Sequence, residues 1–192
     1  MSAFPLRAEL RLAAVAGWLS AAVLLVNAAK RAAILPTTPL TQLVAPLGQI
    51  FAIGLVLGLF ALCRGQGGRF LRIGLAANLI ALAGLVGAEF VINLVFSYSD
   101  TAEVDALLAG PLGIALTVVS ILFILASLAF VAGLWRTGLA PRVPLAVYAV
   151  TAVLIGLRAF VPEPVFLLAI ALLAVAVAWL AVTLWRREPE PA

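Results

Sequence analysis

The sequence lacks the residue types on which most metal and nucleophilic chemistry depends. It contains no histidine, one cysteine and one methionine. Without imidazoles or a set of thiolates, the chain has no ligand set for zinc, copper, haem or iron–sulfur clusters. The same absences exclude Ser-His-Asp and Cys-His catalysis, and the single lysine, Lys30, does not belong to a phosphate-binding loop. We therefore expect no bound metal and no cofactor.

Charged residues are scarce as well. They make up 10% of the 192 residues, while hydrophobic residues make up 66%, against about 25% and roughly 45 to 50% in soluble domains. This composition excludes a water-soluble fold, and at about 20 residues per span it is sufficient for six transmembrane helices. No connection has the roughly 50 residues that a separate soluble domain needs. The sequence predicts one membrane domain, residues 1–192.

The apolar stretches predict an all-α, polytopic membrane protein that folds as a compact bundle of six transmembrane helices. The expected spans are residues 12–29, 43–63, 73–96, 112–135, 143–161 and 165–185. Each is close to or above the roughly 18 residues that distinguish a spanning helix from a buried one. The fifth is short and carries Arg158 near its end.

In this arrangement the basic residues divide unequally between the two sides of the membrane. One side carries Arg7, Arg11, Arg64, Arg69, Arg72, Arg136, Arg142, Arg186 and Arg187, and the other carries Lys30, Arg31 and Arg158. The positive-inside rule then places both termini in the cytoplasm. Contact with anionic lipids explains the net charge of +4, and no nucleic-acid partner is expected.

The first span has an alternative interpretation as a signal peptide. Arg7 and Arg11 precede an apolar stretch, and Val26-Asn27-Ala28 resembles a cleavage site between small residues. We expect the span to be retained, because its removal would leave five helices.

Similar tripeptides end the second, fourth and sixth spans. They are Leu62-Cys63-Arg64, Leu134-Trp135-Arg136 and Leu184-Trp185-Arg186. Three related helical hairpins would give this pattern, and so would independent anchoring of Trp and Arg at the headgroup level. We expect independent anchoring, because Trp and Arg are enriched at the headgroup level of membrane helices in general.

Small residues indicate where helices approach closely. Gly54 and Gly58 form a GxxxG motif in the second span. We expect these glycines to pack inside the bundle, and as the alternative to contact a second copy of the chain or another membrane protein. Membrane lipids are the other expected partner.

The connection before the fourth span carries a helix-start signal. Asp100-Thr-Ala-Glu103 has the spacing of an N-cap residue and its partner three residues on. It predicts a short interfacial helix that ends before Gly110 and Pro111.

Polar residues share one depth beneath the outer surface. At a rise of ~1.5 Å per residue, Asn27, Glu89 and Arg158 reach the same level, and Gln49 and Thr117 fall beside them. Lys30 and Asn93 lie one turn further out. We predict a ligand-binding set that consists of Asn27, Lys30, Gln49, Glu89, Asn93 and Arg158.

Glu89 requires a partner, because a charged group at this depth is costly unless it faces the bundle interior. Arg158 or Lys30 would keep it ionised, whereas an apolar pocket would favour its protonated form. The layer could also be a buried ion pair that fixes helix register. A second polar set, Asn78, Ser127, Tyr148 and Thr151, lies in the inner half and indicates interhelical hydrogen bonds.

The segment from Leu134 to Arg142, which follows the fourth span, together with a glutamate in the third span, resembles a widespread bacterial family of six-helix membrane proteins of unknown function. The resemblance implies a multi-pass protein of the bacterial cytoplasmic (inner) membrane. It implies no activity.

Three functional hypotheses follow. The first is an outward-opening polar pocket that binds, or helps transport, a small amphiphilic or anionic molecule. The second is an intramembrane enzyme in which Glu89 acts as general acid on an isoprenoid or lipid, with Phe90, Phe96 and Tyr98 shielding a cation. The third is a non-catalytic accessory subunit of a larger membrane complex. We consider an enzyme the less well supported class.

Overall fold

The computed structural model describes residues 4–63 and 65–187, which are almost entirely α-helical and contain no strand. The long helices are α1 (Phe4–Arg31), α3 (Leu47–Leu62), α4 (Gly68–Leu94), α6 (Pro111–Thr137), α7 (Arg142–Gly156) and α8 (Glu163–Arg186). The short elements are α2 (Pro39–Val44), α5 (Thr101–Leu108) and the 3-10 turns η1 (Phe96–Tyr98) and η2 (Arg158–Phe160). The all-α prediction is confirmed.

Five helical segments of the described chain are long and apolar enough to cross a membrane. They are Arg7–Arg31, Pro39–Leu62, Gly68–Tyr98, Pro111–Thr137 and Glu163–Arg186. The remaining long helix, α7, has 15 residues, or about 22 Å against a hydrocarbon core of ~30 Å. The expected continuous span 143–161 is therefore wrong in its extent. The helix ends at Gly156, a residue type of low helix propensity, and the chain continues as η2.

The expected second span, residues 43–63, is interrupted near its start. α2 ends at Val44 and α3 begins at Leu47, because Pro46 has no backbone N–H to continue the helix. Exposed backbone groups inside a membrane need partners. The Asn27 amide donates to the carbonyl of Ala45 at 3.4 Å, and Ser20 donates to the carbonyl of Gly48 at 2.8 Å. Side chains of α1 thus stabilise the break.

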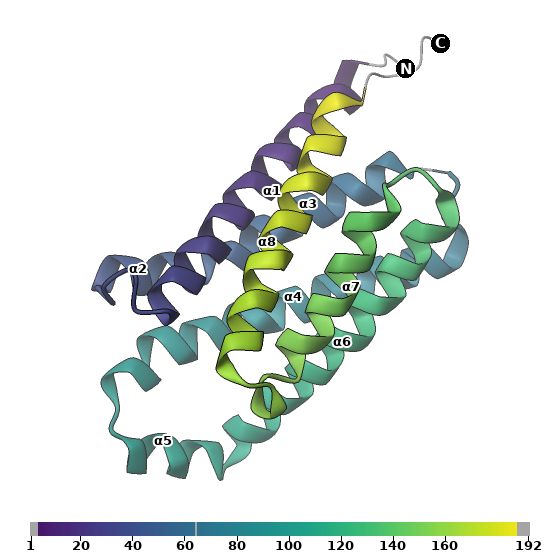
Figure 1. Cartoon of the computed structure of the whole chain (residues 1–192). Coiled ribbons are helices and arrows are strands. Elements are labelled where there is room, and N and C mark those ends of the chain that lie inside the picture. The colour runs from purple at the N-terminus through teal and green to yellow at the C-terminus, as the bar shows by residue number, and fades with distance from the viewer. Residues whose placement is uncertain (1–3, 64, 188–192) are drawn as a thin grey trace.

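The six long helices form a ring in which each contacts the next in chain order, and α8 closes the ring against α1. Figure 1 shows the start of α1 and the end of α8 at one end of the bundle, here the terminal end, and α5 at the opposite, distal end. The hairpins α1/α3, α4/α6 and α7/α8 each turn at the distal end through short helical elements. This arrangement fits three related hairpins, whose common origin stays a prediction.

The connections at the distal end include the predicted interfacial helix. Asp100 is the N-cap of α5 and accepts a hydrogen bond from the backbone N–H of Glu103 at 2.9 Å. The Glu103 carboxylate accepts in return from the backbone N–H of Asp100 at 3.3 Å. Pro111 then begins α6 directly after Gly110. The capping box and the position of this short helix are confirmed.

Close contact between α1 and α3 depends on glycine. A Cβ atom at Gly54 would lie 2.8 Å from the Cβ of Ala16, and one at Gly58 would overlap the Cβ of Ala13. Both glycines of the GxxxG motif therefore pack within the bundle. A role for them in contacting a second chain stays a prediction.

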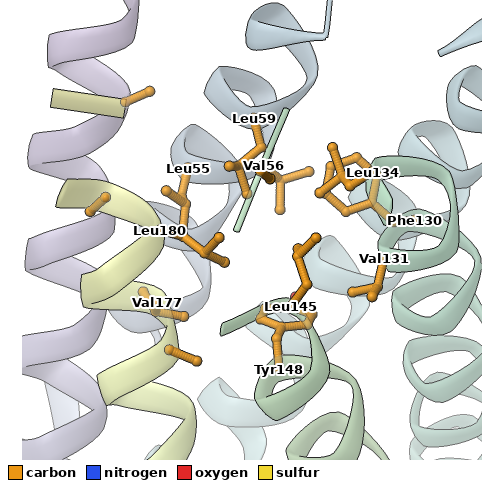
Figure 2. Packing of buried hydrophobic residues seen from close by; sticks show 14 of the residues in the cluster. Leu55, Val56, Leu59, Phe130, Val131, Leu134, Leu145, Tyr148, Val177 and Leu180 are labelled. Atoms are coloured by element: carbon orange, nitrogen blue, oxygen red, sulfur yellow. The ribbon is translucent and has the colours of Figure 1, made fainter. Parts of the chain in front are cut away.

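The terminal half of the ring is filled by apolar side chains that meet at its centre (Figure 2). The labelled residues are Leu55, Val56 and Leu59 of α3, Phe130, Val131 and Leu134 of α6, Leu145 and Tyr148 of α7, and Val177 and Leu180 of α8. α3 also contacts α8 across the ring. This core closes the terminal half.

Candidate functional site

A cavity of about 120 Å³ lies in the distal half of the ring and is bordered by all six long helices. Such a volume holds on the order of ten water molecules. All six residues of the predicted binding set line it, together with Ser20 and Arg31. The six are Asn27, Lys30, Gln49, Glu89, Asn93 and Arg158.

The cavity has a polar distal part and an apolar floor. The floor is made of Leu24, Ala52, Leu82, Leu85, Phe123, Leu173 and Val177. Tyr148 lies deepest on α7 and belongs both to this lining and to the core of the terminal half. The division of polar and apolar lining matches the two parts of an amphiphilic molecule.

Glu89 and Lys30 are joined through an amide. The Lys30 ammonium donates to Asn93 Oδ1 at 2.7 Å, and Asn93 Nδ2 donates to Glu89 Oε2 at 2.8 Å. In the part of the chain that the structure describes, no cationic nitrogen lies within 4.0 Å of the Glu89 carboxylate. The direct ion pair with Arg158 or Lys30 that we considered does not form in the described chain. Between Lys30 and Glu89, the Asn93 side chain, itself 7% exposed, bridges the two charged groups.

Two acceptors in the cavity wall lack donors. Asn27 Oδ1 and Gln49 Oε1 are buried, and no donor reaches them from the described residues. A buried acceptor without a donor costs about 1 to 3 kcal/mol. Both residues line the cavity, but these two oxygens have almost no accessible surface and so do not face its open space.

Two arginines share one aromatic ring at the rim of the cavity. The guanidinium carbons of Arg31 and Arg158 lie 5.0 and 5.2 Å from the centroid of Phe166, within the range of a cation–π interaction. Arg31 Nε also donates to Glu163 Oε1 at 3.3 Å. Sequence reasoning missed Arg31 and Phe166. Helical spacing four residues beyond Asn27 could have identified Arg31, while Phe166 gave no signal among so many apolar residues.

Thr117, which we expected in the polar layer, is not part of the site. It is exposed on α6, does not line the cavity, and its hydroxyl donates to the carbonyl of Gly113 at 2.8 Å. The depth was predicted from sequence, whereas the direction of the side chain depends on how α6 rotates against its neighbours. α6 contributes Phe123 to the cavity instead.

The aromatic residues that the enzyme hypothesis requires lie elsewhere. Phe90 and Tyr98 are exposed, and neither they nor Phe96 line the cavity. The Tyr98 hydroxyl donates to Gln42 Oε1 at 2.7 Å and so connects η1 to α2. None of these three aromatic side chains therefore borders the cavity with Glu89.

The inner polar set does not extend the cavity across the bundle. Asn78 Nδ2 donates to Ser127 Oγ at 3.2 Å, which joins α4 to α6 as an interhelical hydrogen bond. Asn78 Oδ1 also lacks a donor, but Asn78 lies outside the cavity and beside the phenol of Tyr148. Of the four residues in this set, Tyr148 alone lines the cavity. The polar lining ends where the core begins.

The chemistry open to this site is recognition by charge, hydrogen bonding and apolar contact. Among the described residues, no group of three acidic, thiol or imidazole side chains could hold a metal ion. Comparisons with family models, curated proteins and solved structures find no match for this chain. The resemblance to the bacterial six-helix family stays a prediction.

Proposed function

We propose that this chain is a multi-pass membrane protein whose distal cavity binds, or helps transport, a small amphiphilic or anionic molecule. The lining of the cavity carries the proposal, because the cationic groups of Lys30, Arg31 and Arg158 border the same space as an apolar floor. The amide side chains of Asn27, Gln49 and Asn93 belong to the same lining. Such a combination of charged, amide and apolar groups around one space is typical of a small-molecule site.

The membrane part of the proposal is supported by the outer surface of the bundle. Large apolar side chains are exposed there, for example Ile80 at 64%, Leu125 at 61% and Leu168 at 58%. In water such a surface would be an extended apolar patch, whereas in a bilayer it faces acyl chains. We propose six spans, of which the fifth is α7 continued by η2.

Orientation is proposed from the arginines. The terminal end carries most of them in the described chain, while Arg64, assigned to the same side, lies outside the described residues. By the positive-inside rule the terminal end is cytoplasmic and the cavity opens outward. A bacterial cytoplasmic membrane is the proposed location.

Charge in the cavity favours an anionic or amphiphilic ligand. Lys30, Arg31 and Arg158 contribute three positive groups to the lining, against the carboxylate of Glu89. A cavity lined mainly by one sign of charge attracts the opposite sign, most strongly where the walls have a low dielectric constant. The apolar floor supplies contact area for a hydrocarbon part.

The packed terminal half favours binding as the primary event. Leu55, Phe130 and Leu134 are each about 1% exposed at the centre of the ring. Movement of a ligand across the bilayer would require these side chains to separate, as in the alternating access of transporters. A ligand can reach the cavity without that change.

The test is ligand-dependent thermal stability in an uncharged detergent, with dodecanoate and dodecanol as probes. We expect dodecanoate to raise the midpoint of thermal unfolding, because a ligand that binds the folded state stabilises it. Glu89→Gln and Arg158→Ala should reduce this shift. Glu103→Gln on α5 and Arg142→Ala at the terminal end, both exposed and outside the cavity, are the matched controls. An equal response in all five proteins, or none in any of them, would contradict the proposal.

A further inference from the structure

We propose that Arg31 and Arg158 form an anion clamp, which holds the anionic headgroup of a single-chain amphiphile while its chain lies on the apolar floor. This inference rests on the proposed function and specifies its ligand. Arg31 belongs to α1, Arg158 to η2 and Phe166 to α8, so the clamp joins three elements at the cavity rim.

The ring of Phe166 positions both guanidinium groups. Their carbons lie 5.0 and 5.2 Å from its centroid, and Phe166 itself is 5% exposed. A guanidinium that stacks on an aromatic face keeps its N–H groups at its edge available for a planar acceptor. Carboxylate and phosphate oxygens match this geometry and form charge-assisted hydrogen bonds.

Donors at the rim are available for such an acceptor. Arg31 uses Nε for Glu163, which leaves its four terminal N–H groups. None of the five donors of Arg158 has a hydrogen-bond partner among the residues that the structure describes. An unpaired guanidinium beside a second one favours a bound anion, because the two like charges repel each other.

The carboxylate nearest in the cavity does not neutralise this pair. Glu89 is hydrogen-bonded to Asn93, and no guanidinium nitrogen of Arg31 or Arg158 lies within 4.0 Å of it. Of the two arginines, only Arg31 forms an ion pair with Glu163. The positive charge of Arg158 therefore has no counter-charge within 4.0 Å in the described chain, and a ligand anion would supply one.

The apolar part of the ligand has a continuous surface beneath the clamp. Ile170, Leu173 and Val177 follow Phe166 along the same face of α8, at helical spacing. Leu85 and Phe123 complete this wall on α4 and α6. Because the volume of about 120 Å³ accepts on the order of ten water-sized groups, it suits part of one hydrocarbon chain better than two chains, and the rest of a longer chain would extend out of the cavity.

The experiment measures dissociation constants for the full-length protein in a bulky, uncharged steroid detergent that cannot itself enter the cavity. The probes are dodecyl phosphate, dodecanol, dodecyltrimethylammonium and inorganic phosphate. We expect dodecyl phosphate to bind at least about tenfold more tightly than dodecanol, since a charge-assisted pair is roughly twice as strong as a neutral one. The cationic probe should bind most weakly.

Substitutions assign the effect to the clamp. Arg158→Gln should weaken the binding of dodecyl phosphate at least about tenfold and leave the affinity for dodecanol unchanged. Unchanged binding of dodecanol also shows that the cavity is intact. Phe166→Leu keeps an apolar side chain and should weaken dodecyl phosphate a few-fold through loss of the cation–π contacts. Arg136→Gln is the matched control, because Arg136 stacks on Phe70 at 4.4 Å at the terminal end, far from the cavity.

The remaining outcomes contradict the clamp, the single-chain ligand or the proposed function. Equal affinity for dodecyl phosphate, dodecanol and dodecyltrimethylammonium overturns the clamp and leaves the proposed function standing. Inorganic phosphate that binds as tightly as dodecyl phosphate overturns the requirement for a chain. Tighter binding of dioleoyl phosphatidic acid overturns the single-chain ligand in favour of a membrane lipid. If no probe binds, the proposed function itself fails.

Discussion

The two halves of the bundle are built from the same six helices, but they differ in how their centres are filled. In the terminal half, Leu55, Phe130 and Leu134 meet at the centre and leave almost no exposed surface. In the distal half, the helices surround a cavity with charged and amide side chains in its wall. In a membrane bundle, a polar residue therefore indicates a binding site when it borders a space that the protein leaves open.

Asn78 and Gln49 illustrate this difference. Asn78 is fully buried and donates to Ser127 across the α4/α6 contact, which is the ordinary use of an amide between membrane helices. Gln49 borders the cavity, and its Oε1 lacks a donor, as does Oδ1 of Asn78. The two residue types are nearly equivalent chemically, so their surroundings decide their roles.

The sharpest stability test compares two phenylalanines of α6 that are seven residues apart on one face. Phe130→Ala should lower the free energy of unfolding by about 3 kcal/mol, because it opens a void in a packed core. Phe123→Ala should lower it by about 1 kcal/mol, since it enlarges a cavity that already exists. Unfolding in mixed detergent and dodecyl sulfate micelles measures both. Equal losses would show that the two halves are packed alike.

The contact between α1 and α3 gives the next largest expected effect. Gly58→Ala should destabilise the protein by about 2 kcal/mol, because the new Cβ would overlap that of Ala13. Gly87→Ala is the control, since nothing lies within 4 Å of a Cβ at that position. Light scattering on the same samples tests the oligomer hypothesis. If Gly58→Ala left the stability unchanged but reduced the mass of the oligomer, the motif would form an interface between chains and not a contact within the bundle.

Amide substitutions should give opposite signs in the two halves. Asn78→Leu removes the hydrogen bond to Ser127 together with an acceptor that lacks a donor, and should destabilise the protein by up to about 1 kcal/mol. Gln49→Leu removes an acceptor that has no donor and should stabilise the unliganded protein by up to about 1 kcal/mol. Thermal unfolding of both variants without added ligand is the measurement. Destabilisation by Gln49→Leu would indicate that Gln49 serves the fold.

The smallest expected change concerns the ion pair at the rim. Glu163→Gln removes the partner of Arg31, whose pair spans 3.3 Å between partly exposed side chains. Exposed pairs contribute about 0.2 to 1 kcal/mol, so we expect a loss of about 0.5 kcal/mol that disappears in high salt. A loss that persists in high salt would show that Glu163 contributes more than this pair.

Hydropathy was sufficient for the fold class, and the rise per residue was sufficient for the depth of the site. Residues as distant in the chain as Asn27, Gln49 and Arg158 line one cavity because their helices place them at one level. Composition alone also indicated that the chain is helical and apolar enough for a membrane.

The direction of each side chain depends on the rotation of its helix and on local breaks in the helices. The depth of a residue determines neither. Thr117 lies at the predicted level but faces outward, because helix packing sets its direction. The end of α7 at Gly156 and the break at Pro46 are local backbone events within apolar stretches. The insertion of Asn93 between Lys30 and Glu89 depends on side-chain geometry that spacing does not report.

Cysteine labelling in lipid vesicles tests the central claim, an accessible polar cavity in one half and a closed core in the other. The background is Cys63→Ala, which removes the single, buried cysteine. A small, charged methanethiosulfonate reagent should modify Gln49→Cys at least about tenfold faster than Asn78→Cys, because accessibility governs the thiolate's reaction. Equal protection of both thiols from the reagent would contradict the account.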